Sequence, residues 1–252
     1  MPNIDVSFSD LQNLIGRKLP AEPDKLTELL QFVKGEVESW EGDALTINLQ
    51  DGNRPDLWCV EGLARELRGA LEIEKGLKEY SANSSDYKVY VHAKLQKIRG
   101  YIACVVVKNV KLTDALIKQI MQQQDKIDGT YGRKRVKTSI GLYKFDSLKW
   151  PLKYGITNPN ENAFVPLNFS EQLTPKQILE KHPKGLEYQH LLKGLPEYPI
   201  FLDADGKVLS MPPIINSNDL GQINETANNI LVEVTGTDYE AVNNVLRIMA
   251  MT

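Results

Sequence analysis

The sequence predicts an α+β protein in which a small N-terminal α+β domain is followed by a larger mixed α/β domain. Apolar residues recur at helical spacing in some segments and alternate in others, so both kinds of element are expected. The polar stretch GLKEYSANSSDY, residues 76–87, has no strong period and predicts a linker. With 252 residues, the chain is long enough for one large or two medium domains. We therefore expect domains at residues 1–80 and 86–252.

The expected elements of the first domain follow from caps and periodicity. Ser9 is predicted to cap a helix that ends at Gly16. A second helix is expected from about Asp24, and an alternating strand at residues 45–49. A third helix is expected to carry Pro55 in its first turn, where proline is tolerated.

The second domain begins with short β-rich runs, YKVYV and YIACVVVKNV, before a helix that opens at Thr113 or Asp114. Residues 150–168 contain three prolines and are expected to form a loop. The pair Thr174-Pro175 predicts another helix start.

The C-terminal part of this domain predicts a hairpin, a strand and a helix. YPIFLDADGKVLSMPP indicates a strand, a DADG turn and a returning strand, and NILVEVTGTD indicates a further strand. Thr237 and Glu240 have the spacing of a capping box for the last helix. That helix reaches Met251-Thr252 without a stop signal, so we expect a longer polypeptide.

Composition excludes some classes of function. The chain is 42% hydrophobic and 25% charged, which is typical of soluble globular proteins, and its net charge of -3 means that any nucleic-acid contact must come from a local patch. Cys59 and Cys104 match no metal or redox spacing, which favours a reduced, cytosolic compartment. We find neither a signal peptide nor an apolar run long enough to span a bilayer.

The familiar catalytic and cofactor motifs are not found. The three histidines are not at ligand spacing, so no metal site is expected. No Walker A or GxGxxG stretch occurs. Ser210 has no histidine nearby in sequence, so the catalytic residues stay unknown. Asp203 and Asp205 before Gly206 favour a β-turn over a calcium loop, because the later acidic ligands are missing.

A short basic run follows the long helix. Arg133, Lys134, Arg135 and Lys137 are expected either to form a solvated hairpin or to contact the phosphates of a nucleic acid.

The strand NILVEVT places Leu231, Glu233 and Thr235 on one face. A carboxylate in so apolar a strand needs solvent or a donor, so that face is either exposed or part of a ligand pocket. The stretch VLSMPPIINS adds two prolines, which predict a rigid apolar wall between Ser210 and Asn216.

Several of these stretches resemble the β subunit of phenylalanyl-tRNA synthetase of the archaeal and eukaryotic type. They are NRPDLWCVEGLARELRG, RKRVKTSIGLYKFDSLK, and YPIFLDADGKVLSMPPIINS followed by NILVEVTGTD. Phe145 and Ser147 depart from the family pattern in the second stretch.

The resemblance implies that residues 86–252 form an editing domain, which hydrolyses tyrosine wrongly esterified to the phenylalanine tRNA. It implies a cytoplasmic protein whose partners are the acceptor end of that tRNA and the α subunit of the synthetase. ATP and magnesium would serve only the full synthetase, and no cofactor is expected here. The alternative is a non-catalytic module that binds tRNA or scaffolds the subunits.

The resemblance also places the family's editing pocket in these segments. Glu233, Thr235 and Ser210 are the expected partners of the tyrosine hydroxyl, and Asn216 that of the amino-acid or ribose end. The ring and its wall are expected to be formed by Phe201, Leu202, Met211, Pro212 and Ile215.

Overall fold

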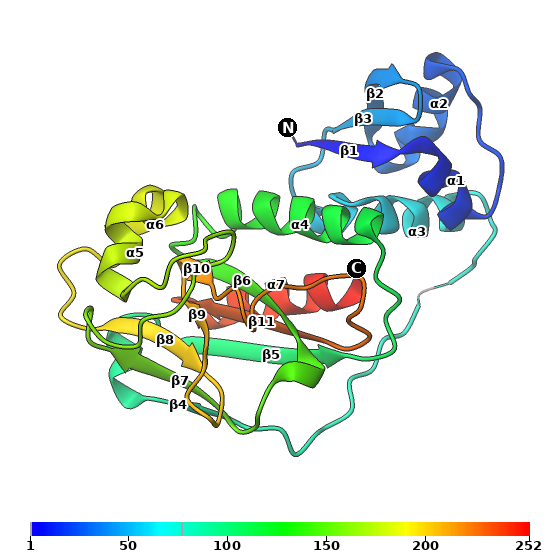
Figure 1. The fold of residues 1–252 in the computed structure, drawn as a ribbon. Helices are drawn as coiled ribbons and strands as arrows, with labels where there is room; N and C mark the ends of the chain where they lie inside the picture. Colours follow the sequence, from blue (N-terminus) through cyan, green and yellow to red (C-terminus); the bar gives the residue numbers. More distant parts are fainter. Residues whose placement is uncertain (1, 77) are drawn as a thin grey trace. The chain divides into compact units, whose positions relative to one another are not determined.

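The computed structural model describes residues 2–76 and 78–252 and confirms a mixture of helices and sheets. The strands and α-helices follow one another in the order β1 (Asn3–Ser7), α1 (Phe8–Ile15), α2 (Pro23–Leu30), β2 (Gly35–Glu41), β3 (Ala44–Leu49), α3 (Val60–Ala70), β4 (Val89–Val91), β5 (Tyr101–Val107), α4 (Asp114–Gly129), β6 (Thr138–Lys144), β7 (Leu152–Thr157), α5 (Pro175–Lys181), α6 (Pro183–Tyr188), β8 (Tyr198–Leu202), β9 (Val208–Met211), β10 (Ile215–Asn216), β11 (Ile230–Gly236) and α7 (Tyr239–Met251) (Figure 1). The short 3-10 helices are η1 (Gln31–Val33), η2 (Pro55–Leu57), η3 (Ala93–Lys97), η4 (Phe145–Ser147) and η5 (Gln189–Leu191).

The chain forms two compact units. The first consists of Met1–Ala82, Lys118–Ile127 and Met251–Thr252, and the second of Asn83–Ile117 and Asp128–Ala250. The expected domains at residues 1–80 and 86–252 stay a prediction, because compactness does not test whether each part folds on its own.

The first unit is built on an antiparallel sheet with the strand order β1-β3-β2. Its first helix begins two residues earlier than predicted. Ser7 caps α1 by accepting a hydrogen bond from the backbone N–H of Asp10, whereas Ser9 lies inside the helix and its hydroxyl donates to Asp43 at 2.9 Å. Gly16 ends the helix as predicted, and it does so in the left-handed conformation with a φ of 78°.

The second unit contains two sheets whose side chains meet in one buried cluster. One sheet has the order β10-β9-β8-β7-β4, and the other has the order β5-β11-β6. Tyr143 and Leu231 from the smaller sheet pack with Tyr154, Phe201 and Leu209 from the larger sheet. We call this set, with its neighbours, the inner cluster.

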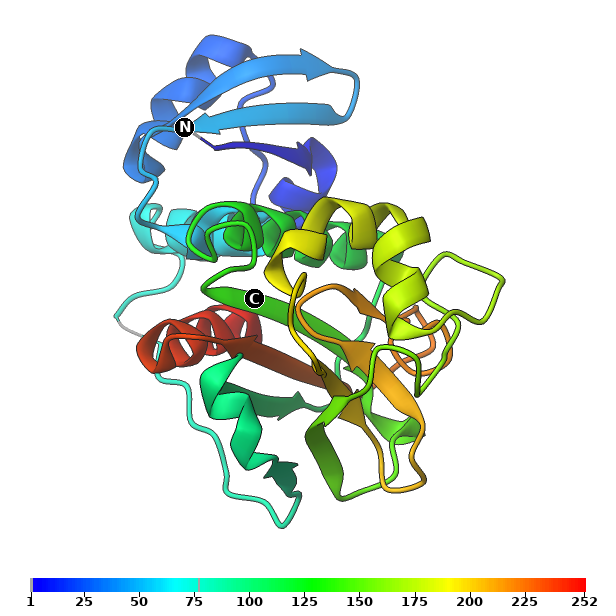
Figure 2. The ribbon, with the colours of Figure 1, turned by 90° about the vertical axis from the view of Figure 1, so that its left-hand side faces the viewer.

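The opposite face of the larger sheet is covered by α5 and α6, which lie beside it in Figure 2. Ile178 and Tyr188 from these helices pack with Ile200 and Met211 from the sheet. We call this set the outer cluster. Since neighbouring residues of a strand point to opposite faces, Ile200 and Phe201 serve different clusters.

The segment 150–168, expected to be a loop, contains the strand β7, and that prediction was wrong. β7 pairs in parallel with β4 and antiparallel with β8. Pro151 precedes the strand and so removes no hydrogen bond from the ladder. Leu152 and Tyr154 are fully buried on either side of exposed Lys153, which is the alternation that the prolines obscured.

The last helix also begins differently from the prediction. The carboxylate of Asp238 accepts a hydrogen bond from the Ala241 N–H at 2.9 Å and so caps α7. The Thr237 hydroxyl instead donates to the Val136 carbonyl at 3.2 Å, so Thr237 does not form a capping box with Glu240. The predicted start of α5 is confirmed, because Thr174 and Gln177 form a capping box there.

Candidate functional site

A bulge turns Ser210 toward the inner cluster. Phe201 pairs with Ser210 while Leu202 pairs with Val208, so Leu209 is an extra residue in β9. A bulge of this kind re-aims the side chains beside it. Leu209 and Ser210 both face the inner cluster in consequence, and Ser210 is only 2% exposed.

Three polar side chains form a chain of hydrogen bonds inside the inner cluster. The Tyr143 hydroxyl lies 2.8 Å from the Ser210 hydroxyl and 2.9 Å from Oε2 of Glu233. A phenol has a single proton, and an ionised carboxylate can only accept. With Glu233 ionised, Tyr143 therefore donates to Glu233, and Ser210 donates to Tyr143.

Glu233 lies in the middle of β11, paired with Cys104 on one side and Gly141 on the other. Every residue of this strand is buried, so the predicted possibility of a solvent-exposed face is wrong. Burial raises the pKa of Glu233 to about 7, and the nearby groups of Tyr143, Arg99 and Thr235 offset part of that rise.

The second carboxylate oxygen of Glu233, Oε1, can still accept a hydrogen bond from a ligand. Among the residues that the structure describes, Oε1 has no hydrogen-bond partner although it is buried. Thr235 is close enough to lower the pKa of Glu233, and its hydroxyl accepts a hydrogen bond from Arg99 at 3.0 Å and lies 3.1 Å from the Ser139 hydroxyl. A buried acceptor without a partner is costly and is suited to a ligand that donates a hydrogen bond.

Gly141 leaves the space that this arrangement needs. A Cβ at this position would collide with the hydroxyl of Tyr143 and with Oε2 of Glu233. Glycine is therefore required for close approach, and the sequence alone does not indicate this role.

Arg99, which the sequence did not single out, holds the end of β11 beside the site. Its guanidinium donates to the hydroxyl of Thr235 at 3.0 Å, to the carbonyl of Thr235 at 2.8 Å and to the hydroxyl of Ser139 at 3.1 Å. Burial lowers the pKa of Arg99, while the charge of Glu233 acts in the opposite sense. A single arginine outside any motif carries no signal in the sequence that could have revealed this contact.

The predicted ring contacts are divided between the two clusters. Phe201 belongs to the inner cluster, together with Tyr143, whose ring centroid is 5.9 Å away. Leu202, Met211 and Ile215 belong to the outer cluster. The structure thus brings Phe201, Ser210, Glu233 and Thr235 to one side of the larger sheet and the other three apolar residues to the opposite side.

The remaining predicted contacts lie where β9 turns into β10. Pro212 is buried directly after β9. Asn216 is paired with Ser210 across the two strands, and its side-chain amide donates to the Gly221 carbonyl at 3.3 Å. Asn216 is therefore next to Ser210 in the sheet, as a ligand contact would require.

The basic run is not one surface patch. Arg135 is 9% exposed, its Nε lies 3.1 Å from the Asp128 carboxylate, and its guanidinium carbon lies 4.4 Å from the centre of the Tyr188 ring. It also donates to the carbonyls of Pro213 and Ile214. The expectation that Arg135 offers its charge to a phosphate therefore conflicts with its position inside the protein.

The other members of the run remain closer to solvent. Lys137 forms an ion pair with Asp238 at 3.1 Å and lies over the Tyr131 ring. Arg133 and Lys134 are exposed, and both have left-handed backbone conformations, with φ of 52° and 51°. These two charges stay available for the predicted phosphate contact.

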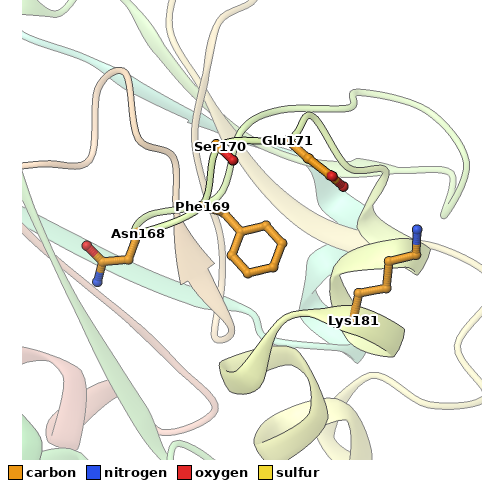
Figure 3. Close-up of a pocket in the computed structure, with 5 residues that line it drawn as sticks. All are labelled: Asn168, Phe169, Ser170, Glu171 and Lys181. Carbon is orange, nitrogen blue, oxygen red and sulfur yellow. The ribbon is translucent and has the colours of Figure 1, made fainter.

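A separate pocket of about 480 Å³ lies between a loop and α5 (Figure 3). It is lined by Asn168, Phe169, Ser170, Glu171 and Lys181. None of the predicted site residues lines it, so it does not bear on the inner cluster.

Among the residues that the structure describes, no helix is both long enough and apolar enough to cross a membrane.

The chain is similar to known proteins over nearly its whole length, although no family model matches it. It is 44% identical over 246 residues to the phenylalanine–tRNA ligase β subunit of Pyrococcus furiosus, a match that covers 96% of this chain and 44% of the relative. It is 40% identical over 250 residues to the same subunit of Methanosphaera stadtmanae, covering 99% of this chain and 44% of that relative. The chain thus spans less than half the length of these curated relatives.

Among solved structures, the chain resembles an N-terminal fragment of the phenylalanyl-tRNA synthetase β subunit from Pyrococcus horikoshii. The TM-score is 0.93 at 41% sequence identity, and the match covers 98% of this chain and 72% of that fragment.

Proposed function

The chain belongs to the family of phenylalanine–tRNA ligase β subunits, and from this premise we propose that its second compact unit hydrolyses tyrosine from mischarged phenylalanine tRNA. The observation that carries the proposal is the buried Oε1 of Glu233, an acceptor without a partner among the described residues. It lies in the same buried cluster as Ser210 and Phe201.

Tyrosine differs from phenylalanine by one hydroxyl, and a pocket built only from apolar side chains rejects such an analogue poorly. A second site that forms hydrogen bonds with the hydroxyl discriminates more strongly between the two amino acids, because bound phenylalanine leaves the polar groups of that site unpaired. Glu233 can favour tyrosine in this way, since its Oε1 can accept a hydrogen bond from the phenol O–H. Because Oε1 is itself covered by protein, a ligand must displace a neighbouring side chain to reach it.

The reaction that we propose is ester hydrolysis. A water oxygen adds to the carbonyl carbon of the tyrosyl ester, the bond from that carbon to the ribose oxygen breaks, and the ribose oxygen leaves with a proton. We assign no general base to the chain, and we propose that a hydroxyl of the terminal ribose assists the water. Glu233 then selects the substrate and does not take part in bond cleavage.

The test is deacylation of tRNA charged with labelled tyrosine or labelled phenylalanine. We expect selective release of tyrosine by the wild-type protein and loss of that release in Glu233→Ala. Glu180→Ala, at an exposed position of α5, is the matched control and should behave as wild type. Unchanged release of tyrosine by Glu233→Ala would remove Glu233 from the mechanism.

The same assay separates editing from a purely binding or scaffolding role. Release by neither this chain nor the complete synthetase would support the non-catalytic alternative. Release by the complete synthetase alone would show that editing needs parts beyond these 252 residues.

A further inference from the structure

Tyr143 is itself a phenol held by the polar groups of the candidate site. It lies on β6, is 0% exposed, and contacts Ser210 and Glu233 at 2.8 and 2.9 Å. Burial raises the pKa of the Tyr143 phenol well above its ordinary value, the Glu233 carboxylate raises this pKa further, and the contact with Ser210 lowers it. Because a phenol has a single proton and an ionised carboxylate only accepts, Tyr143 donates to Glu233 and accepts from the Ser210 hydroxyl.

This direction determines what the site offers to a ligand. The Ser210 proton is directed at Tyr143, and the Tyr143 proton is directed at Oε2 of Glu233. Oε1 of Glu233 and the lone pairs of Ser210 remain, and all of these accept hydrogen bonds. With Glu233 ionised, the polar groups along this chain therefore accept from a ligand and donate nothing to it.

We propose that Tyr143 is a specificity-determining, positioning residue, which orients Glu233 and Ser210 so that these two groups accept a hydrogen bond from the ligand and offer none. Such a site binds the O–H of tyrosine and rejects the ring of phenylalanine or 4-fluorophenylalanine, which have no proton to donate. The proposal rests on the editing function above, and it adds the residue that sets the direction of the hydrogen bonds.

The rival explanation is that Tyr143 only fills the core. Tyr154 provides the matched comparison, because it is also fully buried in the inner cluster and packs against Phe201. Its hydroxyl donates to the Arg99 carbonyl at 3.0 Å and makes no hydrogen bond to Glu233 or Ser210. Tyr143→Phe and Tyr154→Phe thus each remove one buried hydroxyl from the same core.

The first experiment measures kcat/KM for deacylation of tRNA charged with tyrosine, phenylalanine or 4-fluorophenylalanine. We expect Tyr143→Phe to lower the preference for tyrosine about 10- to 100-fold, the range typical of a lost hydrogen bond to a charged group. Tyr154→Phe should retain the preference. An unchanged preference in Tyr143→Phe would overturn the proposal, whereas failure of the wild type to release tyrosine would count against the proposed function.

The second experiment does not depend on activity. The pKa of Glu233 is followed by carbon-13 NMR of selectively labelled glutamate carboxyls, with Glu233→Gln used to assign the signal. Because Tyr143 donates to the carboxylate, Tyr143→Phe should raise this pKa above its wild-type value, which burial places at about 7. A pKa that stays the same or falls in Tyr143→Phe would show that Tyr143 does not orient the carboxylate.

Discussion

Arg135 donates a hydrogen bond of 2.9 Å from its guanidinium to the backbone carbonyl of Ile214, a residue 79 positions further along the sequence. A second bond, of 3.2 Å, reaches the carbonyl of Pro213. Prolines remove backbone donors, but their buried carbonyls still need partners. The wall after β9 therefore depends on an arginine from the basic run, and the two sequence features that we considered separately form one structure.

Replacing Arg135 tests this dependence. Arg135→Met removes both bonds to the wall and the ion pair with Asp128, so the free energy of unfolding should fall by about 3–5 kcal/mol. Arg135→Lys should recover only part of this, because a lysine cannot reproduce the planar fork. Urea unfolding measures the change. Exposed Arg133→Met is the control, with an expected change within about 0.5 kcal/mol, and a comparable loss there would contradict the assignment.

Gly141 is a second point where the site depends on local space. Gly141→Ala forces a methyl group against Tyr143 and Glu233, so unfolding should become easier by about 1–3 kcal/mol. The tyrosine preference in deacylation should fall as well, since both partners must shift. Gly155→Ala in β7 is the matched control, because a Cβ there meets no atom within 4 Å. Equal stability of Gly141→Ala and wild type would show that the neighbours can move aside freely.

The sequence predicted those parts of the site that depend on local geometry. The period of a strand placed Leu231, Glu233 and Thr235 on one face, and the structure agrees: Leu231 packs in the inner cluster, and Glu233 and Thr235 bond to groups beside it. The register between distant strands was not predictable in this way. Tyr143 meets Ser210 across 67 positions, which no local pattern encodes.

Backbone conformation explains the mixed outcome for the basic run. Arg133, Lys134 and Arg135 all have positive φ, with values of 52°, 51° and 66°. Left-handed turns of this kind are uncommon for residues other than glycine and are not indicated by charged side chains. The turn leaves the first two side chains exposed and the third buried, so residues of the same chemical type have different environments.

The stability of the protein should depend on pH through Glu233. Its pKa is about 7 in the folded protein and near 4.5 when unfolded, so between these values the folded state binds more protons. The free energy of unfolding therefore falls as pH rises through this window, by about 3 kcal/mol in total for a shift of this size. Glu233→Gln lacks this contribution.

Urea unfolding at about pH 5 and about pH 8 measures the difference. We expect the wild type to lose more stability over this range than Glu233→Gln does. Glu61, whose pKa burial also raises to about 7, is present in both proteins and cancels in the comparison. Parallel pH curves for the two proteins would mean that ionisation of Glu233 carries no penalty in the fold.

The remaining charges of the basic run predict a specific dependence of tRNA binding on salt. If Arg133 and Lys134 contact phosphates, replacing both with methionine should weaken binding of phenylalanine tRNA by a similar factor whether or not it carries tyrosine. The slope of log K against log salt concentration should become shallower by about 1.4–1.8, since each phosphate contact contributes about 0.7–0.9. Filter binding over a range of salt concentrations measures both effects.

The control replaces two other exposed lysines of the second unit, Lys153 and Lys176, and so removes the same charge elsewhere. Because the screened attraction of a distant charge is weak, this variant should keep nearly the wild-type slope. A slope that changes equally in both variants would indicate a general charge effect. A slope that changes in neither would leave Arg133 and Lys134 as a solvated turn, which is the alternative that the sequence also allowed.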